Sequence, residues 1–299
     1  MATRSAGTTS PVRIACLVPA ATDIVAALGL GENLVGVSHE CDHPLAAGLP
    51  VLTSASIAAA GLDADTDPAW VDAQVSAALE AGTALYRTDL ALLRQLEPDV
   101  VIGQAICDVC AVPADTVAGH LPEGASLVAL EATSLTGLED DLAAVGHALG
   151  AGDAADRLVA SLRSRITAAG AAAPEPAPSV LVLEWGDPPF VGGHWIPELV
   201  TRAGGTHVLG SADEPSRRAT WGEIRHADPD IIIHAPCGYL LEVAVDEARR
   251  LFRPLGLDDR VWVADASRLF SRCTPVVAET VEALATIFAG GSPPGFVHL

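Results

Sequence analysis

The chain has 299 residues, 50% of them hydrophobic, and a formal net charge of −21. This length provides for a sizeable core and for two domains. The acidic balance excludes nucleic-acid binding, which needs a basic face, and no apolar run is long enough for a transmembrane segment.

The first part of the sequence predicts short strands that alternate with helices. Strands are expected at residues 12–18, 34–37, 100–102 and 127–130, where apolar residues run together. Helices are expected at residues 24–30 and 76–96, the second of them broken near Gly82. Alternation of this kind is typical of an α/β fold built on a parallel sheet.

A helical segment follows and leads into a second α/β region. From Leu138 to Ile166, apolar residues recur at helical intervals, with a break at residues 150–152. Further strands are expected at residues 180–183, 231–233 and 261–264, and further helices at 196–203 and 276–288. We therefore predict an N-terminal lobe at residues 12–137, a bridging helical segment at 138–172 and a C-terminal lobe at 178–299, beyond an Ala- and Pro-rich boundary.

One short sequence motif, here called the repeated phrase, occurs twice. Glu97-Pro98-Asp99 precedes the β-branched run 100–102, and Asp228-Pro229-Asp230 precedes the run 231–233. Each run suits a parallel strand that is buried on both faces. The repetition predicts two doubly wound α/β lobes bridged by a long helix, with a ligand cleft between the strand ends of the two lobes.

Five of the six cysteines fall in the predicted cleft loops; one is Cys273, and the other four are candidate metal ligands with open interpretations. Cys107 and Cys110 follow one repeated strand, Cys237 follows the other, and Cys41 follows the strand at 34–37. Thiolates are soft donors, so the four could hold zinc or an iron–sulfur cluster. The alternatives are half-buried packing residues and a redox dithiol formed by Cys107 and Cys110.

Aromatic and polar side chains accompany the cysteines. The aromatic candidates for ligand binding are Trp185, Phe190, Trp195, Tyr239 and Phe270, and the polar candidates are Gln104, His194 and Arg272. Ring faces suit a flat, apolar ligand, although packing beneath the loops would use the same residues. No nucleophile–base pair or acid–base pair can be placed, so we predict that the protein is not an enzyme.

Several phrases, taken in order, carry a family resemblance. They are Val18–Ile24, residues 35–44, residues 85–89, the stretch 96–110, residues 183–190, residues 203–205 and residues 270–272. With them the chain resembles the cobalamin-binding branch of the iron-siderophore and vitamin B12 substrate-binding proteins that serve ABC importers, in a cysteine-bearing subgroup.

The resemblance implies a class III periplasmic-binding-protein-like fold with one rigid bridging helix. It also implies aromatic side chains against a corrin ring, with Trp185 or Phe190 and Phe270 as candidates and Arg272 available for polar groups. An ABC permease would dock through one surface carboxylate per lobe, and Asp89 and Glu223 are the nearest residues here.

We therefore predict a binding protein for cobalamin, a related corrinoid or another small metal-complex ligand. One alternative is an intracellular protein that holds its own iron–sulfur cluster or zinc through the cleft cysteines. The other is the substrate-binding component of an importer. Residues 1–11 are polar and lack the apolar core of a signal peptide. We accordingly expect a cytoplasmic location, or a periplasmic or extracellular one if a leader has been removed.

Overall fold

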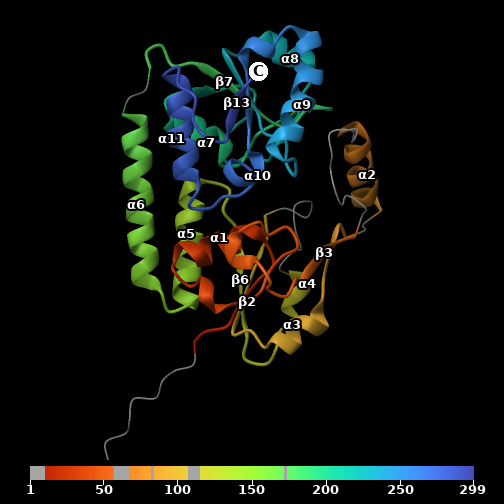
Figure 1. The fold of residues 1–299 in the computed structure, drawn as a ribbon, viewed down its shortest axis with the longest axis vertical. Helices are drawn as coiled ribbons and strands as arrows, with labels where there is room; N and C mark the ends of the chain where they lie inside the picture. Colours follow the sequence, from red (N-terminus) through yellow and green to blue (C-terminus); the bar gives the residue numbers. More distant parts are fainter. Residues whose placement is uncertain (1–10, 57–67, 82–83, 107–114, 172–173) are drawn as a thin grey trace, which may run out of the picture.

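Two α/β lobes lie one above the other in the computed structural model, which describes residues 11–56, 68–81, 84–106, 115–171 and 174–299 (Figure 1). In the N-terminal lobe, four parallel strands lie in the order β2-β1-β5-β6. Their bounds are β1 Ile14–Cys16, β2 Leu34–Gly36, β5 Val100–Gln104 and β6 Ser126–Leu130. An antiparallel pair, β3 Thr53–Ala55 and β4 Tyr86–Thr88, forms a separate two-stranded sheet. The helices of this lobe are α1 Pro19–Ala27, α2 Pro68–Glu80, α3 Leu90–Leu96 and α4 Asp115–Ala118.

The C-terminal lobe has a larger, mixed sheet. Its centre is parallel, with β7 Ser179–Trp185, β11 Ile231–His234 and β12 Val261–Ala264 side by side, and β9 Thr206–His207 also runs parallel to β7. The edge strands β8 Phe190–Val191, β10 Arg217–Arg218 and β13 Phe296–His298 are antiparallel. The helices are α7 Ile196–Arg202, α8 Trp221–Ala227, α9 Leu241–Phe252, α10 Ala266–Leu269 and α11 Val277–Phe288.

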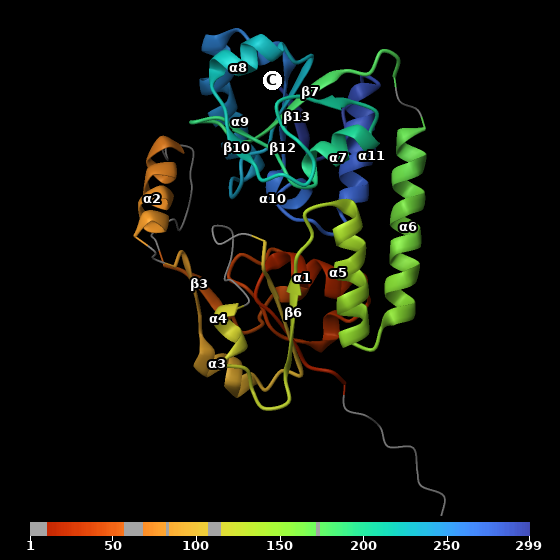
Figure 2. The same ribbon diagram turned by 180° about the vertical axis from the view of Figure 1, so that it is seen from behind.

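The bridging segment consists of two helices rather than one. Helix α5 Leu135–Ala148 packs on β6 and on α6 Gly152–Gly170, and α6 runs along one side of the molecule to pack on α7 and α11 (Figures 1 and 2). The helical pattern predicted from Leu138 to Ile166, with its break at residues 150–152, is confirmed.

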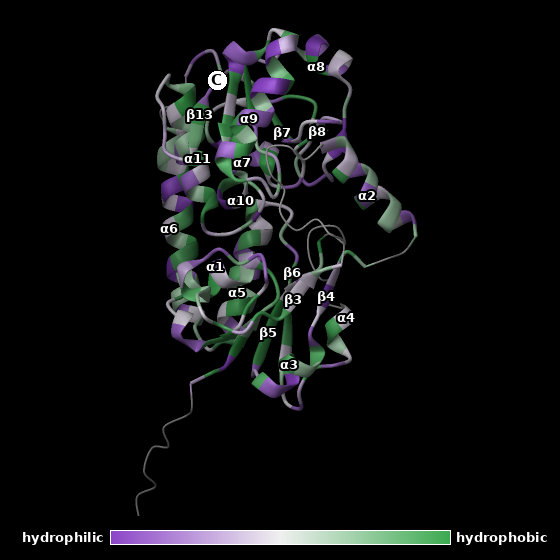
Figure 3. Cartoon of the chain, turned by 45° about the vertical axis from the view of Figure 1, so that its right-hand side comes forward, coloured by the Kyte–Doolittle hydropathy of each residue, from purple (hydrophilic) through white to green (hydrophobic). Residues whose placement is uncertain are grey.

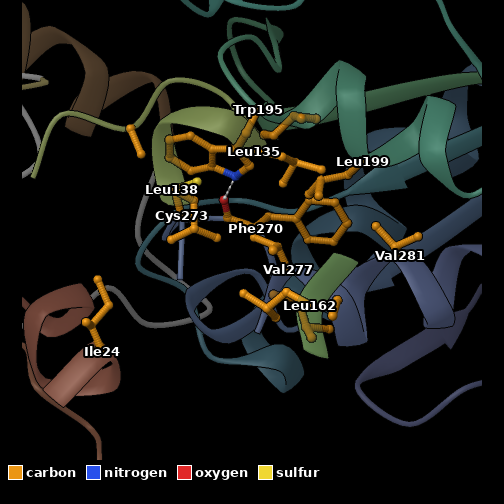
Figure 4. Packing of buried hydrophobic residues seen from close by; sticks show 14 of the residues in the cluster. Ile24, Leu135, Leu138, Leu162, Trp195, Leu199, Phe270, Cys273, Val277 and Val281 are labelled. Atoms are coloured by element: carbon orange, nitrogen blue, oxygen red, sulfur yellow. Dashed lines mark hydrogen bonds between the residues drawn. The ribbon is translucent and has the colours of Figure 1, made fainter. Parts of the chain in front are cut away.

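A continuous hydrophobic cluster joins the two lobes through these helices. It includes Leu142 of α5, Leu162 of α6 and Val281 of α11, together with side chains of both sheets (Figure 4). Each buried leucine of this kind stabilises the fold by roughly 2 kcal/mol. Because the shared core runs along the bridging helices, the two lobes are held rigidly on that side.

The repeated phrase folds the same way in both lobes. Glu97 ends α3 and Asp228 ends α8, each in the left-handed conformation with φ 42°. Two residues later, an aspartate carboxylate accepts a hydrogen bond from the backbone of the neighbouring strand. Asp99 accepts from the N–H of Arg13, just before β1, at 2.7 Å, and Asp230 accepts from the N–H of Ser179, the first residue of β7, at 2.8 Å. Hydrophobic residues then fill the strand, as Figure 3 shows for β5.

One expectation needs correction. The helical region expected over residues 76–96, broken near Gly82, is helical only at its two ends, in α2 and α3. Between them the chain forms β4, in which Tyr86 pairs with Ala55 of β3. In the C-terminal lobe, short antiparallel strands close the edges of the sheet.

Candidate functional site

The loops at the carboxyl ends of the strands bring the lobes into contact. Asp23 lies in α1 after β1, Asp42 follows β2, and Arg272 follows α10 beyond β12. The Arg272 Nη1 atom lies 2.8 Å from Asp42 Oδ1 and 3.4 Å from Asp23 Oδ2. This contact joins residues 230 positions apart in the chain and defines a point where the predicted cleft loops of both lobes meet.

The electrostatics at this point follow from partial burial. The Arg272 side chain is 12% exposed, and that of Asp23 is similarly covered. Burial raises the pKa of Asp23, with the Arg272 charge opposing and the Asp42 charge reinforcing the change. Burial also acts to raise the pKa of Asp42, but the hydrogen bond and charge of Arg272 outweigh it, so that pKa is lowered. Arg272 therefore acts as a clamp on both carboxylates.

Two of the predicted soft donors adjoin this clamp. Cys41 precedes Asp42, and Cys237 accepts a hydrogen bond from Ser271 Oγ at 3.4 Å, next to Arg272. Both cysteines are partly exposed, and neither forms a disulfide within the described part of the chain. Cys107 and Cys110 lie outside the described residues. Within the described ranges, no three His, Cys, Asp or Glu side chains are grouped to hold a metal ion.

The aromatic candidates divide by burial. Trp185 and Phe190 are half-buried, and the Trp185 ring lies 5.4 Å from that of Tyr239, which is buried in the lobe. Phe270 is 1% exposed, and its backbone oxygen accepts a hydrogen bond from the buried Trp195 Nε1 at 3.2 Å (Figure 4). The rings of Tyr239, Trp195 and Phe270 thus support the cleft loops, while Trp185 and Phe190 keep accessible surface.

The polar candidates lie at different depths. Gln104 ends β5 and is half-buried. His194 stacks on Trp195 with ring centroids 5.9 Å apart, and its backbone N–H donates to Glu214 at 2.6 Å. Burial lowers the pKa of His194, with the charge of Asp213 opposing, so its imidazole favours the neutral form.

A second ion pair joins the lobes on the side opposite α6. Arg218 Nη2 of β10 lies 2.8 Å from each carboxylate oxygen of Asp72 in α2 and 3.2 Å from Ser76 Oγ. The same guanidinium lies 5.6 Å from the centroid of the Phe190 ring. Helix α2 therefore reaches from the N-terminal lobe to the edge of the C-terminal sheet (Figures 1 and 2).

One buried polar pair beneath the site was missed by sequence reasoning. His234 ends β11 with no exposed surface, and its Nε2 forms a hydrogen bond with Glu247 of α9, which is 5% exposed. A Cβ atom at Gly186 would lie 2.7 Å from Glu247 Oε1, so the loop after Trp185 closes directly over this pair. The only signal in the sequence was a histidine directly after three branched aliphatic residues. The residues that join the lobes, Asp23, Asp72 and Arg218, were also missed.

The fold and the facing loops define a two-lobed solute-binding protein. A family model described as "Periplasmic binding protein" matches residues 14–249, and the chain belongs to this family. Its members are solute-binding proteins rather than enzymes, which confirms that expectation. The family resemblance and the fold class stated from the sequence are confirmed as well, while the cysteine-bearing subgroup stays a prediction.

Solved structures support the same fold. The periplasmic vitamin B12 binding protein BtuF of Vibrio cholerae matches with a TM-score of 0.61 and 19% identity, covering 93% of this chain and 96% of that chain. A periplasmic heme binding protein from Pseudomonas aeruginosa matches with a TM-score of 0.67 and 22% identity, covering 96% and 97%. The periplasmic heme-binding protein RhuT from Roseiflexus sp. RS-1 matches with a TM-score of 0.66 and 22% identity, covering 94% and 99%.

No curated protein matches the chain. Of the helices within the described residues, none combines the length and the apolar character that a membrane crossing requires.

Proposed function

We propose that the protein binds a corrinoid in the cleft between its lobes. The observation that carries the proposal is the position of Trp185 and Phe190, two half-buried rings at the carboxyl end of β7 and in the adjoining strand β8. Their ring faces suit the rim and face of a flat macrocycle. Gln104, His194 and Arg272 are the proposed polar contacts, because amide groups around a corrin ring both donate and accept hydrogen bonds.

Titration with a corrinoid tests this proposal. Dicyanocobinamide added to the purified protein should bind with one-to-one stoichiometry by calorimetry. Trp185→Ala should weaken binding at least about tenfold, because the ligand loses an aromatic contact. Trp262→Ala is the matched control, since Trp262 packs on His298 at the β12–β13 edge, with ring centroids 4.7 Å apart. No binding by the wild-type protein, or equal losses in the two variants, would contradict the proposal.

A metal centre of the protein's own is the second candidate. It is supported by the Arg272–Asp42 pair, which draws together the segments that carry Cys41 and Cys237. Cys107 and Cys110 would complete a set of four thiolates for zinc or an iron–sulfur cluster. Anaerobic purification followed by absorption spectroscopy and elemental analysis for Co, Fe and Zn separates the candidates. Unchanged Fe and Zn content after Cys237→Ser would argue against this centre.

Delivery to an ABC permease completes the proposal, because the family binds small-molecule ligands for such permeases. The two carboxylates nearest the expected docking positions begin the two equivalent helices. Asp89 accepts hydrogen bonds from the first turn of α3, and Glu223 forms a capping box with Thr220 at the start of α8. Both are exposed and one lies on each lobe, which suits a permease that contacts both lobes at once. Charge reversal at both positions should abolish co-purification with a cognate permease.

A further inference from the structure

An excess of carboxylates surrounds the single guanidinium at the meeting point of the lobes. Asp23 and Asp42 both contact Arg272, and the charge of Arg272 also acts on Glu40. Glu40 lies 3.5 Å from the Tyr86 hydroxyl and 4.0 Å from His39 Nε2. Two carboxylates therefore contact one guanidinium, and a third, that of Glu40, lies two positions before Asp42, in a chain whose basic residues are all arginines.

From this arrangement we infer that the cleft selects a ligand without negative charge at its periphery, and that Asp42 and Glu40 enforce the selection. The inference rests on the proposed function, because it names the chemical class of the ligand in the same cleft. A macrocycle with amides at its periphery belongs to this class of ligand, and a macrocycle with carboxylates there does not.

Arg272 already contacts two carboxylates. Asp42 lies 2.8 Å and Asp23 3.4 Å from its Nη1 atom. A ligand carboxylate that bound the remaining N–H groups of this guanidinium would add a further negative charge beside Asp42 and beside Asp23, whose side chain is largely covered. A neutral amide oxygen in the same place adds no such repulsion.

A second arginine between the lobes is also paired. Arg218 is held by both oxygens of Asp72, so its charge is also matched by a carboxylate. A ligand carboxylate would thus meet two guanidinium groups that are both paired, together with the unmatched charge of the acidic cluster. Like charges a few ångströms apart in a partly desolvated cleft repel strongly.

Amide groups of a ligand can form hydrogen bonds with both the carboxylates and the guanidinium. An amide N–H donates to carboxylate oxygens such as those of Glu40 and Asp42, and an amide oxygen accepts from guanidinium N–H groups. Within the described residues, the contacts of Arg272 all use its Nη1 atom, so its Nε and Nη2 hydrogens suit such an oxygen. A neutral amide makes these contacts without breaking the ion pairs.

Two ligands with the same ring test the inference. Dicyanocobinamide carries amides around the corrin, whereas dicyanocobyrinic acid carries carboxylates. Wild-type protein should bind the amide form at least about a hundredfold more tightly at low ionic strength. Asp42→Asn and Glu40→Gln should each lower the ratio of the two affinities about tenfold, and added salt should lower the same ratio in the wild type.

Asp153→Asn is the matched control, because it removes the same charge from an exposed position in the first turn of α6. The inference is overturned if the carboxylate form binds as tightly as the amide form. It is also overturned if Asp42→Asn and Glu40→Gln change the ratio no more than Asp153→Asn does. Failure of both corrinoids to bind overturns the proposed function itself, and the inference with it.

Discussion

The two strands that follow a Pro-Asp turn begin alike and end differently. At their starts, Asp99 and Asp230 make equivalent hydrogen bonds to the neighbouring strand. At their ends, β5 finishes in the half-buried Gln104, whereas β11 finishes in His234, which is buried with Glu247. The shared start therefore serves the fold, whereas the two strand ends differ in burial and in their polar partners.

The difference also has an energetic meaning. A buried histidine–glutamate pair stabilises little overall, because both groups lose their hydration. Its removal is nevertheless costly, since any partner left behind stays buried and unsatisfied. The C-terminal lobe therefore contains a buried polar pair whose disruption would lower stability, beneath the loop in which Gly186 packs closely on Glu247.

Breaking this pair should have the largest effect on stability. Glu247→Ala leaves the His234 imidazole buried without its partner, so we expect the free energy of unfolding to fall by about 3–5 kcal/mol. Gln104→Ala at the equivalent strand end should cost about 1 kcal/mol or less, because Gln104 is partly exposed. Urea denaturation followed by far-ultraviolet circular dichroism measures both.

A double variant separates the polar pair from simple loss of volume. His234→Phe combined with Glu247→Leu replaces both polar groups by apolar ones and should recover a large part of the loss. If the double variant is as unstable as Glu247→Ala, packing rather than an unpaired buried group explains the effect.

Acid should destabilise the protein through a second imidazole of the C-terminal lobe, which is partly buried. His207 pairs with β7, and its Nε2 accepts a hydrogen bond from the Val182 N–H at 3.3 Å. Burial lowers the pKa of His207 from 6.5 to about 4. The unfolded chain therefore binds a proton below pH 6.5 that the folded protein does not bind until about pH 4. Stability falls across this window, by up to about 3 kcal/mol.

His207→Gln tests the origin of this pH dependence. Glutamine supplies an acceptor oxygen but does not titrate, so the free energy of unfolding should change less between pH 6.5 and 4 than in the wild type. His147→Gln on the exposed face of α5 is the control. Identical pH profiles for the wild type and His207→Gln would exclude His207 as the cause.

Local patterns explain which features could be predicted from the sequence. Residues 231–233 are three branched aliphatic residues between a Pro-Asp turn and a loop, and this pattern alone identifies a buried strand. Strands β8 and β10 have only two residues each and take their structure from pairing with each other, so no local pattern marks them. The same holds for the clamp, because Arg272 and Asp42 meet only through the fold.

The candidate site divides in the same way. Loops after strands could be assigned to a cleft because chain direction fixes the edge at which they lie. Burial of individual rings could not be predicted, because Trp185 ends a strand and Phe270 follows a short helix, yet only Trp185 keeps accessible surface. Tertiary packing around α7 and α11 makes that distinction.

The smallest expected effect tests whether the two strand starts are equivalent. Asp99→Ala and Asp230→Ala each remove a carboxylate that accepts a backbone N–H at an exposed turn. Hydrogen bonding to the Ser179 N–H and hydroxyl lowers the pKa of Asp230, in keeping with this role. Each variant should lower the free energy of unfolding by about 1 kcal/mol. Asp140→Ala, which removes an exposed carboxylate within α5, serves as a control in the same urea titrations. If Asp230→Ala lowers the free energy of unfolding by more than about 1 kcal/mol beyond the loss in Asp99→Ala, the two strand starts are not equivalent. The C-terminal turn would then also support the buried pair at the far end of β11.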